Sequence, residues 1–60
     1  MTDTLGARVK AWRIKTKTTR TEAAASVAIS EHYLGRIERG EVEPGGPVTL
    51  LLEQMIARKS

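Results

Sequence analysis

The sequence predicts an all-α, compact four-helix domain. Apolar residues recur three and four positions apart over most of the chain, as they do on one face of an α-helix, and no stretch alternates as a strand would. Hydroxyl side chains, which cap helices well, stand before several of these segments. The chain has 60 residues and no cysteine, so it is expected to form one small domain (residues 1–60) with a modest core and no disulfide.

The first helix is expected to begin near residues 2–4 and to end near Lys15. One face of it carries apolar residues spaced four and three apart: Leu5, Val9 and Trp12. Trp12 is expected to lie in the core. The polar residues 16–18 then connect this helix to the next one.

Two short helices joined by a tight turn are predicted between Thr19 and Gly40. The Thr19 hydroxyl can cap the first helix while Glu22, three residues later, closes a capping box, and Ser30 caps the second helix in the same way. The apolar stripe shared by the two helices consists of Ala23, Ala24, Val27, Ile29, Leu34 and Ile37. Neither helix is long enough to be stable alone, so both must pack into one core.

A last helix is expected after the loop at residues 40–47, which holds three of the five glycines and both prolines. Pro47 suits the first turn of a helix, and helical periodicity runs from Val48 to about Arg58. The apolar stripe is wider than a domain of this size needs. Its surplus is a candidate dimer interface, for which we expect Leu50, Leu51, Met55 and Ile56.

Charge and composition favour a polyanionic partner and disfavour catalysis. The formal net charge is +3, and residues 1–20 hold six basic residues against one acidic residue. His32 is the only histidine, so no set of metal ligands is expected, and no nucleophile–base pair or phosphate loop is visible. We expect no enzyme activity, no cofactor and no small-molecule ligand. The apolar runs are too short to span a membrane and no signal peptide is visible, so a cytoplasmic protein is expected.

From about Leu5 to Pro44 the chain resembles the Cro/Xre-type helix-turn-helix repressors of phages and bacteria. The most specific part is the threonine cap at Thr19, the small Ala24, Ile29-Ser30 at the turn and the pattern Leu34-x-x-Ile37-Glu38-x-Gly40. The resemblance implies a lambda-repressor-like DNA-binding fold. It also implies an ion pair between Arg13 and Glu38, largely buried, that ties the first helix to the recognition helix.

The chain departs from the family pattern in several places. Lys17 stands where the family usually has the glycine that ends the first helix, and Ala28 stands where a turn glycine is common. The chain also stops after the fourth helix, whereas many relatives have a fifth that forms the dimer contact, which leaves the mode of dimerisation open.

Helical geometry places Glu31, His32, Gly35 and Arg36 on the face opposite Leu34 and Ile37. Candidate base-reading residues are Glu31, His32 and Arg36, of which Arg36 best suits the acceptors of guanine; Gly35 would let the helix approach the groove. Candidate phosphate-binding residues are Lys17, Thr19, Arg20, Tyr33 and Arg39. Two alternatives stay open: Glu31 as a carboxylate that only favours the helix dipole, and His32 as a plain solvent-facing residue.

These observations predict a sequence-specific regulator of transcription. The expected protein is a homodimeric repressor whose partner is a double-stranded DNA operator with an inverted repeat. The resemblance to Cro/Xre-type repressors implies that it is a repressor or autorepressor of a phage or mobile-element operon. The alternative from another class is an antitoxin-like protein-interaction module that uses the C-terminal helix to hold a partner. A recombination directionality factor, which bends DNA at several sites, is a further alternative.

Overall fold

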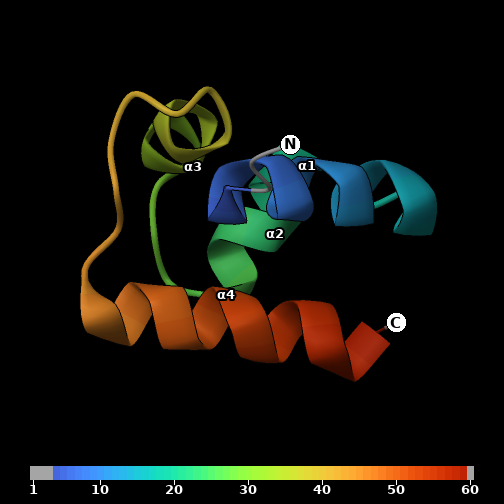
Figure 1. Cartoon of the computed structure of the whole chain (residues 1–60). Helices are drawn as coiled ribbons and strands as arrows, with labels where there is room; N and C mark the ends of the chain where they lie inside the picture. The colour runs from blue at the N-terminus through green and yellow to red at the C-terminus, as the bar shows by residue number, and fades with distance from the viewer. Residues whose placement is uncertain (1–3, 60) are drawn as a thin grey trace.

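The computed structural model describes residues 4–59, and these form four helices: α1 (Leu5–Thr16), α2 (Arg20–Ser26), α3 (Glu31–Glu38) and α4 (Gly46–Lys59). Figure 1 shows α4 along one side of the molecule and α3 on the other, with the connection between them running down one edge. Helix α1 contacts both α3 and α4, and α2 contacts α3. The all-α prediction is confirmed. No helix among the described residues is long and apolar enough to cross a membrane.

The helix starts follow the predicted caps. The Thr19 hydroxyl accepts a hydrogen bond from the backbone N–H of Glu22 at 3.1 Å, and the Glu22 carboxylate accepts one from the N–H of Thr19 at 3.0 Å. The Ser30 hydroxyl accepts a hydrogen bond from the N–H of Tyr33 at 3.0 Å. Thr4 caps α1 in the same way, within the range expected for that start. Each cap satisfies a backbone donor that a helix start would otherwise leave without a partner.

Helices α1, α2 and α3 each end in a turn of the same type. After α1, α2 and α3, one residue adopts the left-handed conformation: Lys17 (φ 57°), Ala28 (φ 58°) and Gly40 (φ 77°). In each case the next residue's N–H donates to a carbonyl five positions back, at 2.9 to 3.0 Å. This closure reverses the chain within two residues and satisfies carbonyls at the helix end. Only the third position has a glycine, which accepts such a φ without strain.

The core lies where the helices meet, and within residues 4–58 its buried hydrophobic residues are Val9, Trp12, Ala23, Ala24, Val27, Leu34, Ile37, Leu52 and Met55. The predicted apolar stripe is confirmed, with Ile29 packed against the core from a half-buried position. One expectation is wrong. Met55 was expected at a dimer interface, but its side chain is 6% exposed because α4 turns Leu52 and Met55 inward together. Ile56 also packs against the core, half-buried.

Gly6 fixes how closely α1 approaches the end of α3. A Cβ atom built on Gly6 would lie 2.0 Å from the carbonyl oxygen of Ile37, which is far inside any allowed contact. Only glycine fits where these two backbones cross. The crossing positions the C-terminal end of α3, and with it Glu38, against α1.

Candidate nucleic-acid interface

Helix α3 presents a polar face to solvent. Glu31, His32 and Arg36 are all exposed, whereas Leu34 and Ile37 on the opposite side are buried. The three candidate base-reading side chains therefore share one exposed surface of a single helix, as predicted from helical geometry. The Glu31 carboxylate accepts a hydrogen bond from the Thr21 hydroxyl of α2 at 2.5 Å.

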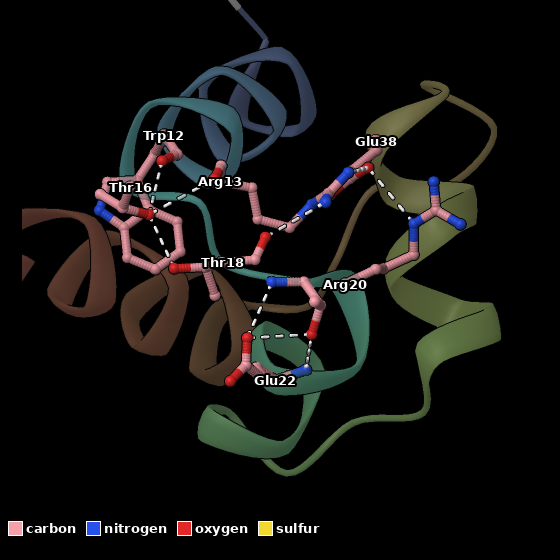
Figure 2. A network of polar contacts seen from close by, with 8 residues as sticks. Trp12, Arg13, Thr16, Thr18, Arg20, Glu22 and Glu38 are labelled. Atoms are coloured by element: carbon pink, nitrogen blue, oxygen red, sulfur yellow. Dashed lines mark hydrogen bonds and ion pairs between the residues drawn. The ribbon is translucent and has the colours of Figure 1, made fainter.

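Glu38 anchors α3 to α1 at the edge of this face. Its side chain is 2% exposed, and the Arg13 guanidinium donates to both of its oxygens, from Nε at 2.7 Å and from Nη2 at 3.0 Å. The hydrogen bonds to Glu38 raise the pKa of Arg13 above its usual value. Arg13 also donates to the backbone carbonyl of Thr18 at 3.4 Å (Figure 2). The bidentate pair of Arg13 and Glu38 thus links α1 to α3, and the hydrogen bond from Arg13 to Thr18 links both helices to the turn between α1 and α2.

Arg20 approaches the same carboxylate from α2. Its Nε lies 3.5 Å from Oε1 of Glu38, and Figure 2 shows Arg13 and Arg20 reaching Glu38 from two different sides. The Arg20 Nε is buried and makes no hydrogen bond, although the side chain as a whole is 40% exposed. Because Arg13 occupies both carboxylate oxygens at shorter distances, the charge of Arg20 is only partly compensated.

Glu41 holds two other arginines of this surface. Its carboxylate accepts hydrogen bonds from Nε of Arg39 at 2.6 Å and from Nε of Arg36 at 3.4 Å. The hydrogen bond from Arg39 is the main reason that the pKa of Glu41 lies below its usual 4.5, and the same contact raises the pKa of Arg39. All three side chains are about half-exposed. The sequence prediction missed Glu41, whose position depends on the reversal of the chain at Gly40.

The remaining candidate phosphate-binding residues differ in how available they are. Lys17 is exposed in the turn after α1. Tyr33 is half-buried and packs against the core. Thr19 uses both of its donors within the cap, because its hydroxyl and its backbone N–H each donate to Glu22. The Thr19 side chain therefore has no donor left for a phosphate while the capping box is intact.

Gly35 does not lie open to solvent, contrary to the expectation that it shares the exposed face of α3. It is buried, because side chains from neighbouring segments lie over it. A Cβ atom built on Gly35 would lie 3.2 Å from Nη1 of Arg39 and 3.7 Å from Cδ of Arg20. A surface depression is lined here by Arg20, Glu31, His32, Gly35 and Arg39.

Three large apolar side chains among the described residues are exposed. Leu50 is 58% exposed and Leu51 is 40% exposed on α4, and a small hollow beside Leu51 is lined by Ser26, Met55 and Arg58. Ile14 on α1 is 65% exposed, an apolar position that the sequence prediction did not single out. Of the four residues expected at a dimer interface, Leu50 and Leu51 thus remain accessible.

Comparison with known families gives one match. A family model described as a helix-turn-helix domain matches residues 4–54, which include all of α1, α2 and α3 and most of α4. A search of curated proteins and a search of solved structures found no match.

Proposed function

The chain belongs to the helix-turn-helix domain family, and from this premise we propose that it is a sequence-specific, homodimeric repressor. In this proposal α3 enters the major groove of an operator, where Arg36 reads a guanine and Glu31 and His32 contact neighbouring base edges. Lys17, Arg20, Tyr33 and Arg39 contact the phosphate backbone on either side. The observation that carries the proposal is the single exposed face of α3 with Glu31, His32 and Arg36, flanked by arginines from two other segments.

Arg36 is well placed for base readout. Its Nε is directed to Glu41 at 3.4 Å, so the two terminal nitrogens of the guanidinium have no partner in that contact. Those two nitrogens form the planar fork that matches the O6 and N7 acceptors of guanine, a pairing that discriminates against other bases by about 1–3 kcal/mol. The exposed Glu41 contact restricts the side chain without burying it.

A dimer is proposed because one small domain contacts few base pairs, and inverted half-sites about one helical turn apart are the usual solution. Leu50 and Leu51 supply the apolar contact in this proposal. They belong to α4, and Figure 1 shows α4 and α3 on opposite sides of the molecule, so a contact through α4 leaves the reading surface free in this proposal. Sedimentation equilibrium of wild type and of Leu51→Lys tests this point: the variant is expected to be monomeric at concentrations where the wild type is dimeric. A wild type that stays monomeric at all concentrations removes the homodimer from the proposal.

The role in a phage or mobile-element operon rests on the resemblance to Cro/Xre-type repressors. In this proposal regulation follows from occupancy of the operator: the bound dimer blocks access of polymerase to a nearby promoter. The exposed leucines of α4 equally suit an antitoxin-like module that holds a protein partner, which is the second candidate function. The two candidate functions make different predictions for the arginines near α3: the repressor needs them to bind DNA, whereas the protein-interaction module does not need them.

The deciding experiment is selection from randomised duplex DNA followed by sequencing, at near-physiological salt. Wild type is compared with Arg36→Ala and with Arg8→Ala, a matched control in which an exposed arginine of α1 is removed. We expect an inverted repeat for wild type and for the control, and relaxed selection at one base pair per half-site for Arg36→Ala. Weak, salt-sensitive binding without enrichment, unchanged by Arg36→Ala, would reject the repressor and favour the protein-interaction module.

A further inference from the structure

Two arginines from different segments line the depression over Gly35. Arg20 begins α2, whereas Arg39 directly follows α3. The position that a Cβ atom of Gly35 would occupy lies 3.2 Å from Nη1 of Arg39 and 3.8 Å from Nε of Arg20. Both guanidinium groups therefore border the depression over Gly35, and a side chain at residue 35 would press against the Arg39 guanidinium.

The charges around this space leave an excess of positive charge. Four arginines share two carboxylates: Arg13 and Arg20 meet at Glu38, and Arg36 and Arg39 meet at Glu41. One member of each pair has the short contact, at 2.7 Å or 2.6 Å, and the other lies at 3.4 to 3.5 Å. Like charges at such close range repel each other, and an anion placed between them would relieve the repulsion.

Glu31 is the one acidic residue among those that line the depression. Its carboxylate is engaged by the Thr21 hydroxyl of α2. Arg20 contacts Glu38 and Arg39 contacts Glu41, each through the Nε atom of the arginine. The terminal nitrogens of both guanidinium groups are therefore not used in those contacts. These terminal nitrogens are the donors that bind phosphate oxygens in protein–DNA complexes.

Resting on the DNA-binding function proposed above, we propose that Arg20 and Arg39 together hold one backbone phosphate of the DNA in the depression that they line with Gly35. A phosphodiester has two unbridged oxygens, one for each guanidinium, and its single negative charge lies between two cations. Gly35 is then a positioning residue: it touches no base, but a side chain there displaces the Arg39 guanidinium from its place beside the phosphate. In this proposal the glycine in α3 leaves room for the Arg39 guanidinium, and its role is not to let the helix approach the groove more closely.

The first test is a double-mutant cycle with Arg20→Gln and Arg39→Gln, measured on the selected operator over a range of salt concentrations. Each single variant is expected to lower affinity roughly tenfold, the order of one charge-assisted contact. Because both side chains serve one phosphate, the double variant should lose roughly 20-fold rather than the roughly 100-fold of independent contacts. Its salt slope should fall by no more than about 0.9, the value for one phosphate. Losses that multiply, with twice that change in slope, would overturn the shared contact.

The second test addresses Gly35 and does not remove Arg20 from Glu38. Gly35→Ala and Gly35→Leu are expected to lower affinity in that order, with roughly a tenfold loss for leucine. In an Arg39→Gln background the same changes should have little further effect, since they act through Arg39. The nearest atoms to the new Cβ are ends of flexible side chains, so folding should be kept; Gly46→Ala, whose Cβ meets nothing within 4 Å, is the matched control. An undiminished loss in the Arg39→Gln background would mean that residue 35 obstructs DNA directly, which rejects the proposal.

The two proposals fail in different ways. If wild type selects no operator, the DNA-binding function itself is rejected. If wild type selects an operator but the losses at Arg20 and Arg39 multiply, only the shared phosphate is rejected.

Discussion

The identical turns after α1, α2 and α3 predict opposite effects of two glycine substitutions. Ala28 and Gly40 occupy the same position of this turn, with φ of 58° and 77°. Ala28→Gly is therefore expected to raise the free energy of unfolding, and Gly40→Ala to lower it. Packing does not complicate the comparison, since Ala28 is exposed and a Cβ atom at Gly40 would meet nothing within 4 Å.

The magnitude follows from two terms of opposite sign. A residue with a Cβ atom in the left-handed conformation costs about 1–2 kcal/mol. Glycine offsets part of this relief of strain, because it gives the unfolded chain more conformational freedom and so lowers the free energy of unfolding by about 0.4–1 kcal/mol. The net effect is about 1 kcal/mol in each direction, which corresponds to a change in melting temperature of about 4–8 °C for a domain of this size.

The assay is thermal and urea unfolding followed by circular dichroism and by the fluorescence of Trp12, the only tryptophan and a core residue. Gly45→Ala is the matched control, because a Cβ atom at Gly45 would meet nothing within 4 Å and Gly45 has no left-handed φ, so the effect should stay within a few tenths of a kcal/mol. Destabilisation by Ala28→Gly, or a neutral Gly40→Ala, would show that backbone strain at these turns is not what the φ angles indicate.

Three further predictions concern the polar contacts. Glu38→Gln should lower the free energy of unfolding by about 3–5 kcal/mol, because it leaves Arg13 largely buried without its partner; urea unfolding would measure this, and a loss below about 1 kcal/mol would contradict it. Thr19→Ala should cost about 1 kcal/mol of stability by removing the cap yet leave operator affinity per folded molecule unchanged, and a selective loss of affinity would restore Thr19 as a phosphate contact. The Glu41 carboxyl should titrate below 4.5 by NMR and move back toward that value in Arg39→Gln. Since its folded-state pKa is lowered, the Glu41 contribution to stability is present above pH 4.5 and is lost as pH falls through the folded-state pKa.

Local signals in the sequence predicted the helices well. Thr19 and Ser30 each accept a hydrogen bond from a backbone N–H three residues away, so their identity alone indicates where α2 and α3 begin. The buried positions of α2 and α3 follow from helical spacing in the same way. The rotation of α4 could not be read from spacing, because apolar residues are spread around much of the helix and do not single out one face. Met55 was therefore placed at an interface, although it lies in the core.

The candidate site depends on contacts between segments, which spacing on one helix does not predict. The exposure of Glu31, His32 and Arg36 follows from the buried side of α3. The burial of Gly35 does not, because the side chains that cover it come from Arg20 and Arg39. The acidic partner of Arg36 was not anticipated either, since Glu41 comes near only after the chain reverses at Gly40.

The two carboxylates that share the four arginines differ in burial, and this difference divides the arginines by role. Glu38 is 2% exposed and fixed by two short contacts, so Arg13 cannot leave it without stranding a charge in the core. Glu41 is 46% exposed, so Arg36 and Arg39 can exchange its carboxylate for a base or a phosphate while Glu41 returns to water. An exposed carboxylate costs little to hydrate again, whereas a buried one costs several kcal/mol. In the proposed DNA complex, Arg36 and Arg39 are therefore free to leave Glu41 and Arg20 binds through the terminal nitrogens that do not contact Glu38, whereas Arg13 maintains the fold.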